Sequence, residues 1–367
     1  MSINTIFLDL SVDPTDIVEK LTIISTIKEA LSNFIPGMKD VHSTNFEDGG
    51  FLLVLTASRD SFITVRGFPQ GLVSINIEYF QEEGTEQLLT YEAVKQLETV
   101  LTNVTGSKKS HKFPAIQRGS KIDRYFVTSD GRIIEMDIDA VIFNEQSPYQ
   151  RVQVLHSKTM GNLLVLDELQ NLSERDLIYT ETLMQRGKED YLDKEIVILG
   201  GGDGALLYEL LKERPKFVTM LELDEVVMRA CREHLRSCCG NCLDKLEDIN
   251  YKIVIGDCVK SLDTMIAEGK TVDYVFGDLT DIPVSTSPQG EVWDFIRLIL
   301  NKAMQVLKPT GKYMTHGNGA GSQTSLAMYE NQLRNLKIPV EFTKDKAFIP
   351  SFLEDWVFYQ VSPMKLK

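Results

Sequence analysis

The chain has 367 residues, of which 43% are hydrophobic and 25% charged, as in a soluble globular protein of two or three domains. Its 53 acidic and 39 basic residues give a formal net charge of −14. This charge disfavours nucleic acid and anionic membranes as partners and would attract a polycation, although it can also serve solubility alone. The sequence has no signal-peptide pattern and no apolar run of membrane-spanning length, so we expect a cytosolic protein.

The cysteines are odd in number and crowded into one stretch of the chain: Cys231, Cys238, Cys239, Cys242 and Cys258. This distribution argues against a disulfide framework. Cys239 and Cys242 form a CxxC pair, but no second pair follows at zinc-binding spacing. We therefore interpret the cysteines as reduced thiols and expect no metal site.

Residues 1–118 are predicted to form a small α+β domain. We expect strands over residues 5–10, 51–55, 61–65 and 71–80, with the middle two joined as a hairpin. Apolar residues at helical spacing predict helices over residues 15–34 and 91–101. Because no pocket-like cluster of polar residues occurs here, we expect a structural or dimerisation role.

The stretch of residues 105–119 is polar and basic and is predicted to be a linker. A small antiparallel β domain is expected over residues 119–172, with residues 152–156 and 162–166 forming a hairpin around Gly161.

Residues 173–367 alternate between strand and helix patterns, which predicts an α/β, Rossmann-like doubly wound domain with a mostly parallel sheet, of the methyltransferase-like kind. A late strand could return antiparallel. A helix is expected to start at Ser173, with Asp176 in a capping box. The expected strands are 196–199, 217–221, 251–255, 272–276, 312–315 and 356–360. The expected helices between them are 205–212, 225–235, 259–267, 291–306 and 323–336.

A buried strand runs directly into the glycine cluster Gly200-Gly201-Gly202-Asp203-Gly204. Glycines at such a turn let the backbone approach a nucleotide closely. A carboxylate inside the turn is unsuited to a phosphate, which would compete with it for the helix N-terminus. Asp203 therefore indicates a cationic ligand.

Acidic residues recur where the following strands of this domain end: Glu222, Asp224, Asp257 and Asp278. Ligands of doubly wound sheets bind at the carboxyl ends of the strands, and an acid about twenty residues after the glycines typically accepts from ribose hydroxyls. Any one of these residues could instead be a helix cap. Several in register favour a site for a positively charged nucleoside without phosphate, as in S-adenosyl donors.

Specific motifs resemble those of the polyamine aminopropyltransferase family. They are the stretch 199–204, with Tyr149-Gln150 upstream and Glu222-Leu223-Asp224 downstream. The stretches 278–286 and 350–356 are similar to the family's animal spermine synthase branch. The likeness runs from about residue 122 to the end of the chain, and residues 1–118 resemble the branch's dimerisation domain more weakly.

The resemblance implies decarboxylated S-adenosylmethionine as the aminopropyl donor, spermidine as the acceptor, a homodimer and no cofactor or metal. By motif position, Gln150 and Asp203 would hold the aminopropyl side of the donor. Glu222 would bind its ribose, and Asp257 with Cys258 its adenine. Asp278 would be the catalytic acid–base residue. The residues expected to bind spermidine are Tyr179, Phe352 and Glu354.

For several single residues, an ordinary structural role remains an alternative to a role in the site. Tyr179 could be a packing tyrosine and Glu354 a solvated strand-edge acid. The histidines His156, His234 and His316 show no metal-binding spacing and are interpreted as structural or solvent-facing. Two positions depart from the branch pattern: Phe352 replaces a tyrosine, and Gly277 replaces the asparagine expected before Asp278. The first departure bears on the acceptor, and neither touches the donor site.

Three other functions remain alternatives. A spermidine synthase acting on putrescine typically has an Asp-Ser-Ser-Asp-Pro run where this chain has Asp278-Leu279-Thr280-Asp281. A methyltransferase using S-adenosylmethionine would need a partner for the donor carboxylate, which Asp203 would repel. A non-catalytic polyamine-binding protein would be favoured by loss of Asp278, which is present.

Overall fold

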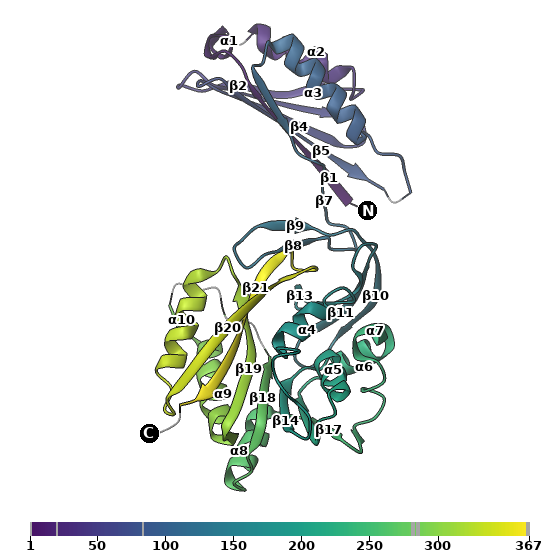
Figure 1. Ribbon diagram of the computed structural model, residues 1–367. Coiled ribbons are helices and arrows are strands. Elements are labelled where there is room, and N and C mark those ends of the chain that lie inside the picture. The colour runs from purple at the N-terminus through teal and green to yellow at the C-terminus, as the bar shows by residue number, and fades with distance from the viewer. Residues whose placement is uncertain (1, 20, 83, 280–282, 284–286, 365–367) are drawn as a thin grey trace. The chain divides into compact units, whose positions relative to one another are not determined.

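The structure is a computed structural model that describes residues 2–19, 21–82, 84–279, 283 and 287–364. Contacts within the chain divide it into two compact units, Met1–Asp123 and Arg124–Lys367 (Figure 1). The division lies near the predicted domain end at residue 118. The further division into residues 119–172 and 173–367 stays a prediction.

The first unit is built on an antiparallel sheet with the strand order β2-β3-β4-β5-β1-β6, and β7 also pairs with β1. Alternate residues of β3, such as Phe51 and Leu53, are buried against Ile27 of α2 and Leu97 of α3, so the helices cover one face of this sheet (Figure 1). The helices are α1 Pro14–Glu19, α2 Leu21–Ser32 and α3 Tyr91–Thr105. The strands are β1 Ser2–Ser11, β2 Lys39–Asn45, β3 Phe51–Ala57, β4 Ser61–Phe68, β5 Leu72–Gln81, β6 Lys109–Lys112 and β7 Ile116–Arg118.

The predicted hairpin is confirmed as the antiparallel pair β3 and β4. The predicted helix over residues 15–34 appears as α1 and α2, and residue 20 lies outside the described part of the chain. The predicted linker over residues 105–119 is wrong, because β6 and β7 pair with β1. Strand β6 lies at the edge of the sheet. Its side chains are polar or charged, so they provide no hydrophobic pattern from which a strand could be predicted.

The second unit begins with the β8–β9 hairpin and a small antiparallel sheet of order β10-β11-β12-β13. Gly161, with a φ of 74°, lies at the predicted turn between β11 and β12, so this hairpin is confirmed. The strands are β8 Tyr125–Val127, β9 Ile133–Glu135, β10 Ile138–Gln146, β11 Arg151–Ser157, β12 Gly161–Leu166 and β13 Leu169–Ser173.

The large sheet of the second unit has the order β16-β17-β15-β14-β18-β19-β21-β20. Strands β17, β15, β14, β18 and β19 run parallel. Strand β21 pairs antiparallel with β19, and β20 pairs antiparallel with β21. The strands are β14 Glu195–Gly200, β15 Phe217–Glu222, β16 Glu247–Asp248, β17 Tyr251–Ile255, β18 Val272–Asp278, β19 Leu307–Gly319, β20 Val340–Ile349 and β21 Glu354–Pro363.

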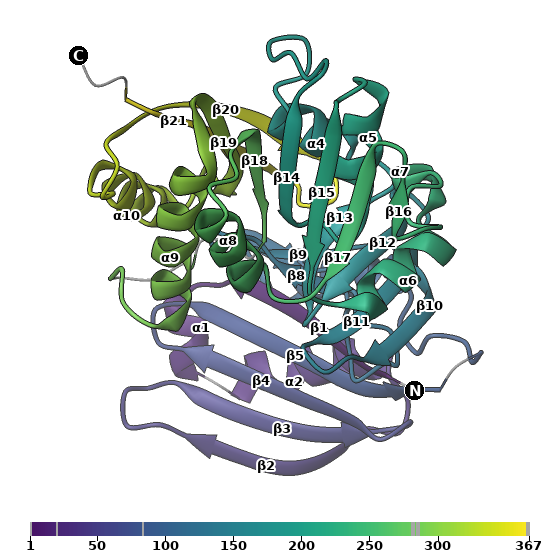
Figure 2. The same cartoon turned by 90° about the horizontal axis from the view of Figure 1, so that it is seen from below.

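Helices cover both faces of this sheet, which confirms the doubly wound prediction (Figure 2). Ile196 and Ile198 of β14 face one core with α4 to α7, and the alternate residues Val197 and Leu199 face a second core with α8 to α10. The helices are α4 Leu177–Leu183, α5 Ala205–Lys212, α6 Glu225–His234, α7 Arg236–Cys239, α8 Cys258–Ala267, α9 Glu291–Val306 and α10 Gln323–Arg334.

Two local predictions in this unit need correction. The helix expected from Ser173 begins at Leu177, because Ser173 still belongs to β13. Strand β20 was not expected, since its exposed, charged edge pattern hides its strand character.

All five cysteines are free thiols. None of the described helices combines the length and apolar character needed to cross a membrane.

The strand order reverses between β14 and β18. From β14 the chain proceeds outward through β15 to β17, then crosses back to β18 and continues outward through β19. At such a switch point the loops after the two central strands diverge and leave a crevice for a ligand. The glycine loop follows β14 and Asp278 ends β18, so both predicted features lie at this crevice.

Candidate functional site

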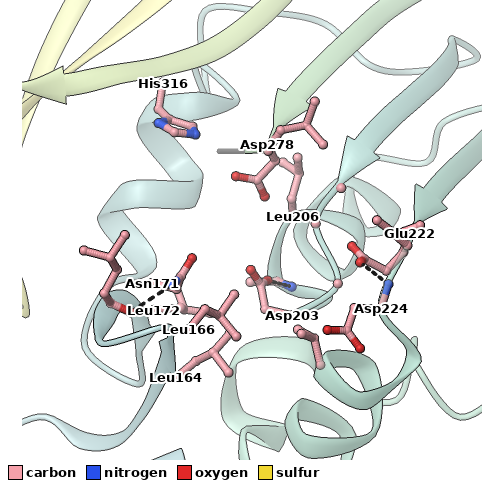
Figure 3. A pocket seen from close by; sticks show the side chains of 18 of the residues that line it. Leu164, Leu166, Asn171, Leu172, Asp203, Leu206, Glu222, Asp224, Asp278 and His316 are labelled. Atoms are coloured by element: carbon pink, nitrogen blue, oxygen red, sulfur yellow. Dashed lines mark hydrogen bonds between the residues drawn. The ribbon is translucent and has the colours of Figure 1, made fainter. Parts of the chain in front are cut away.

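A pocket of about 470 Å³ lies at the carboxyl ends of the parallel strands in the second unit. Figure 3 shows Asp203, Glu222 and Asp278 around one space, with Leu164, Leu166 and Leu172 on its other side. The lining carboxylates are Asp167, Asp203, Glu222, Asp224, Asp257 and Asp278. Among the described residues that line the pocket there is no lysine or arginine. The site is therefore electrostatically suited to a cation.

The glycine loop, residues 200–204, forms one wall of the pocket. Gly200 has a φ of 80°, and a side chain there would collide with the backbone carbonyl of Asp278. A Cβ on Gly202 would lie 2.7 Å from the carboxylate of Glu222. The glycines therefore allow the loop to pack directly against two of the predicted site residues.

Asp203 lies in this loop, two residues before the start of α5. Its Oδ1 accepts a hydrogen bond of 2.7 Å from the backbone N–H of Ala205. Burial raises the pKa of Asp203 above the ordinary value of an aspartate, because the carboxylate is poorly solvated. Asp203 thus accepts from the first residue of α5 and also lines the pocket, and an ammonium group beside it would favour its ionised form.

Glu222 ends β15 and is largely buried, and it accepts a hydrogen bond of 2.7 Å from the backbone N–H of Asp224. Burial, reinforced by the nearby charges of Asp203 and Asp224, raises the pKa of Glu222 to about 7. Ionisation of Asp203 and Glu222 is therefore unfavourable in the protein alone, and a nearby cation or hydrogen-bond donor would favour it.

Gln150 reaches the pocket from the loop before β11. Its Nε2 donates to Asp224 Oδ2 over 3.1 Å, and the hydroxyl of Ser147 donates to the same oxygen over 2.7 Å. The other oxygen of Asp224 accepts from the N–H of Val226 at the start of α6. Gln150 and Asp224 therefore form one buried network that joins the small sheet to the end of β15.

Asp257 and Cys258 line the pocket after β17. Asp257 is exposed and caps α8 through a 2.8 Å hydrogen bond from the N–H of Val259. Cys258 is buried, and burial raises the pKa of its thiol to about 11. The thiol therefore stays protonated near neutral pH and is a poor nucleophile.

Asp278 lies beside the glycine loop, and its backbone carbonyl accepts a hydrogen bond of 3.1 Å from the N–H of Gly201. The hydroxyl of Tyr179 donates to Asp278 Oδ1 over 3.3 Å. The ring of Tyr179 packs among other aromatic rings, with centroids 5.2 to 6.4 Å away: Phe358, His316, Phe352 and Trp356. Asp278 therefore has a polar contact on one side and a wall of aromatic rings beside it.

Glu354 is the one predicted site residue that the structure does not bring to the pocket lining. It is buried at the start of β21, and both carboxylate oxygens accept from Ser129, over 2.8 Å from the N–H and 2.6 Å from the hydroxyl. Its predicted contact with spermidine is untested. The other predicted residues meet at the pocket: Gln150, Tyr179, Asp203, Glu222, Asp257, Cys258, Asp278 and Phe352.

The two departures from the branch pattern have local explanations. A side chain on Gly277 would collide with the hydroxyl of Tyr313, so the phenol occupies the space beside this position. Phe352 is buried and packs on Trp356 with centroids 4.7 Å apart. Of the stretch 278–286, residues 280–282 and 284–286 lie outside the described part of the chain.

Some pocket residues were not predicted. His316 was interpreted as structural, yet its buried ring lies on the pocket wall, and Figure 3 shows it beside the same space as Asp278. Trp356 and Leu164 also line the pocket. The position of His316 at the carboxyl end of β19 was the available signal, since strand ends meet at one edge of a parallel sheet.

Comparisons with known proteins agree with this geometry. A family model described as "Spermine/spermidine synthase domain" matches residues 176–366. A second model, described as "Spermidine synthase tetramerisation domain", matches residues 125–174. Both matches lie within the second structural unit.

Similar proteins carry related names. The polyamine aminopropyltransferase of Aeropyrum pernix is 30% identical over 235 residues, covering 62% of this chain and 71% of that protein. Thermospermine synthase ACAULIS5 of Arabidopsis thaliana is 29% identical over 232 residues, covering 61% and 65%. The chain spans about half the length of the polyamine aminopropyltransferase of Shigella boydii, with 30% identity over 151 residues.

Solved structures of similar fold include a spermidine synthase in complex with the transition state analogue AdoDATO, at a TM-score of 0.55. The likeness has 19% identity and covers 68% of this chain and 82% of that one. A spermidine synthase from Thermotoga maritima has a TM-score of 0.52, at 19% identity with 68% and 81% covered. These likenesses support the methyltransferase-like α/β fold. The family models and the relative from Aeropyrum pernix show that the chain belongs to the spermine/spermidine synthase family of polyamine aminopropyltransferases.

Proposed function

We propose that the chain is a spermine synthase that transfers an aminopropyl group from decarboxylated S-adenosylmethionine to spermidine, giving spermine and 5′-methylthioadenosine. The observation that carries this proposal is the pocket with six carboxylates and no basic residue among its described lining. Both substrates are cations without phosphate or carboxylate groups. A pocket of this charge suits them and opposes an anionic nucleotide.

The donor is assigned to the half of the pocket formed by β14, β15 and β17. Asp203 would pair with the aminopropyl ammonium, with Gln150 beside it. Glu222 would accept from the ribose hydroxyls, and Asp257 with Cys258 would flank the adenine. The raised pKa values of Asp203 and Glu222 support this assignment, because a cationic ligand would stabilise carboxylates that burial leaves poorly solvated.

The acceptor is assigned to the half around Asp278, Tyr179 and Phe352. An alkylamine such as spermidine has a pKa near that of lysine, about 10, so at neutral pH its nitrogen is protonated and lacks a free electron pair. Asp278 would take this proton, directly or through the hydroxyl of Tyr179 that contacts it. The aromatic rings beside it suit the methylene chain and the cationic groups of a polyamine.

The reaction is then an in-line displacement. The freed nitrogen pair attacks the methylene carbon next to the sulfonium, the new C–N bond forms, and the C–S bond breaks with its electrons going to sulfur. The sulfonium becomes a neutral thioether and needs no protonation. Orientation of the two substrates across the β14–β18 crevice would supply much of the rate enhancement.

Putrescine is the nearest alternative acceptor, since similar folds include spermidine synthases. The sequence after β18 favours spermidine in this proposal, whereas Phe352 departs from the tyrosine of the spermine synthase branch. Incubation with decarboxylated S-adenosylmethionine and either amine, followed by mass spectrometry of the products, distinguishes the two. Product from putrescine alone would refute the spermine assignment, and methyl transfer from S-adenosylmethionine would refute the reaction class.

Replacing Asp278 tests its assigned role. Asp278→Asn should lower turnover by about 10²-fold or more, because a general base contributes on this scale, while donor affinity stays nearly unchanged. Asp273→Asn is a matched control at the opposite end of β18, where Asp273 pairs with Lys308 over 2.8 Å. Unimpaired turnover in Asp278→Asn would exclude Asp278 as the base.

We also propose that the enzyme is a cytosolic homodimer joined through its first unit. One face of that unit's sheet packs on helices, and the other carries exposed apolar side chains: Phe62 of β4 and Leu72 and Phe80 of β5. A second copy covering this face would remove these side chains from water.

A further inference from the structure

A buried carboxylate outside the pocket ties together two segments of the second unit. Asp176 immediately precedes α4, and its Oδ2 accepts 2.7 Å from the N–H of Ser173. Its Oδ1 accepts 3.0 Å from the N–H of Ser351, and its Oδ2 also accepts 2.6 Å from the Ser351 hydroxyl. All three residues are essentially inaccessible to solvent, and Asp176 is not among the pocket-lining residues.

The two segments joined by Asp176 each carry part of the aromatic wall beside Asp278. On one side, Tyr179 lies three residues further along α4 and donates to Asp278. On the other side, Phe352 follows Ser351 directly, in the turn between β20 and β21. The next residue, Leu353, has a φ of 52°, which is strained for a leucine and needs support from its surroundings.

A carboxylate is the group that this junction requires. Two backbone N–H groups and one hydroxyl converge on its oxygens, and a buried donor left without an acceptor is costly. An asparagine keeps the shape but presents an NH2 group to at least one N–H donor. The carboxylate therefore fixes the distance between the start of α4 and the turn after β20 in a way that its amide cannot.

We propose that Asp176 is a positioning residue for acceptor specificity: it sets the spacing of Tyr179 and Phe352, and through them the width of the acceptor half of the pocket. This inference rests on the proposed function, in which Tyr179 and Phe352 contact the acceptor. Asp176 touches neither substrate. The donor half, built on β14, β15 and β17, contains no part of this junction.

The test measures the acceptor KM and the donor dissociation constant separately in the full-length Asp176→Asn protein. The KM for the acceptor should rise by about tenfold, because displaced Tyr179 and Phe352 side chains would orient the acceptor less well, while the donor dissociation constant measured by calorimetry is unchanged. Ser351→Ala removes the hydroxyl but keeps the backbone donor and should raise the acceptor KM in the same direction by less. Asp273→Asn, which removes a carboxylate that accepts 2.9 Å from the N–H of Glu195 at the other end of the sheet, should leave both constants unchanged.

The outcomes separate this inference from the proposed function. If neither spermidine nor putrescine is a substrate of the wild-type chain, the proposed function fails and this inference fails with it. If the wild type is active, a lowered melting temperature with an unchanged acceptor KM in Asp176→Asn makes the junction purely structural and overturns the inference. If Asp176→Asn does not fold, an unchanged acceptor KM in Ser351→Ala overturns it.

Discussion

Glu222 shows how a single buried carboxyl group can link protonation, stability and ligand binding. Burial raises the pKa of Glu222 to about 7, so at neutral pH the protein alone holds a substantial fraction of this group protonated. Protonated Glu222 can donate one hydrogen bond, whereas the carboxylate accepts from two hydroxyls. A donor that presents a cation and a ribose to this cluster would therefore release protons as it binds.

The raised pKa predicts a definite pH dependence of stability. Between about pH 4.5 and 7 the folded state binds more protons at Glu222 than the unfolded state does, so the free energy of unfolding falls as pH rises. A shift of this size corresponds to about 3 kcal/mol. Glu222→Gln should flatten this part of the pH profile measured by urea unfolding.

The exposed neighbour Glu225 provides the control, since Glu225→Gln should leave the slope in place. An identical slope in Glu222→Gln would assign the titration to another group. The same variant should weaken donor binding if Glu222 binds the ribose.

Substitutions at Glu354 and Ser129 can distinguish a role of Glu354 in substrate binding from a role in fixing the position of Ser129. Its oxygens accept from Ser129, so reaching the acceptor would require an additional or alternative contact. Glu354→Gln should raise the acceptor KM by about tenfold, in line with loss of a charged hydrogen-bonding partner. Ser129→Ala removes one donor to Glu354 but no acceptor contact and should have a smaller effect. Equal effects in steady-state assays would mean that Glu354 acts only by holding Ser129.

Site residues differ in how far the sequence reveals them. Acids at the ends of parallel strands were predictable, because those ends meet at one edge of the sheet, and Asp203, Glu222, Asp257 and Asp278 do line one pocket. The contact of Asp176 with Ser351 joins residues 175 positions apart. Spacing along the chain carries no information on such a contact, and only the folded structure reveals it.

At the scale of elements, the loop between β14 and α5 makes two different demands on glycine. Gly200→Ala would place a Cβ on the Asp278 carbonyl at a positive φ and should destabilise the fold by about 1–3 kcal/mol. Gly202→Ala would push only against the Glu222 side chain, so it should chiefly weaken donor binding. Thermal unfolding and donor titration measure the two effects.

Gly269 is the matched control for Gly200. It also has a positive φ, of 65°, but a Cβ there meets nothing within 4 Å, so Gly269→Ala reports the backbone strain alone. Equal losses of stability in Gly200→Ala and Gly269→Ala would contradict a steric role for Gly200.

The elements with a clear period were predicted to within a few residues, as for α5 and α9, because burial of one face imposes that period. The elements missed were edge strands. Strand β2, Lys39–Asn45, exposes nearly all of its side chains, and β20 alternates charged residues with half-buried ones. Their hydrogen bonds to neighbouring strands define them, and these bonds leave no hydrophobic signal in the sequence.

At the scale of the whole molecule, the first unit has its own core and a sheet face that carries the exposed apolar side chains Phe62, Leu72 and Phe80. Charged substitutions on this face, Phe62→Asp with Leu72→Asp, should convert a dimer into a monomer, because burying a charge without a partner is costly. Light scattering would give the mass. Activity measured beside it, and in a chain lacking residues 1–118, would show whether dimerisation is required for transfer. If the chain with Phe62→Asp and Leu72→Asp still had the mass of a dimer, this face would be excluded as the interface.

The reversal of strand order between β14 and β18 has an evolutionary consequence. The residues assigned to the donor come mainly from β14, β15 and β17, on one side of this switch point. Those assigned to the acceptor come from β18, α4 and the segment around β21. Substitutions on the second side can change the accepted amine without disturbing the nucleoside. A fold divided in this way permits one donor to be kept while acceptors diversify, and selection on the two sides can proceed independently.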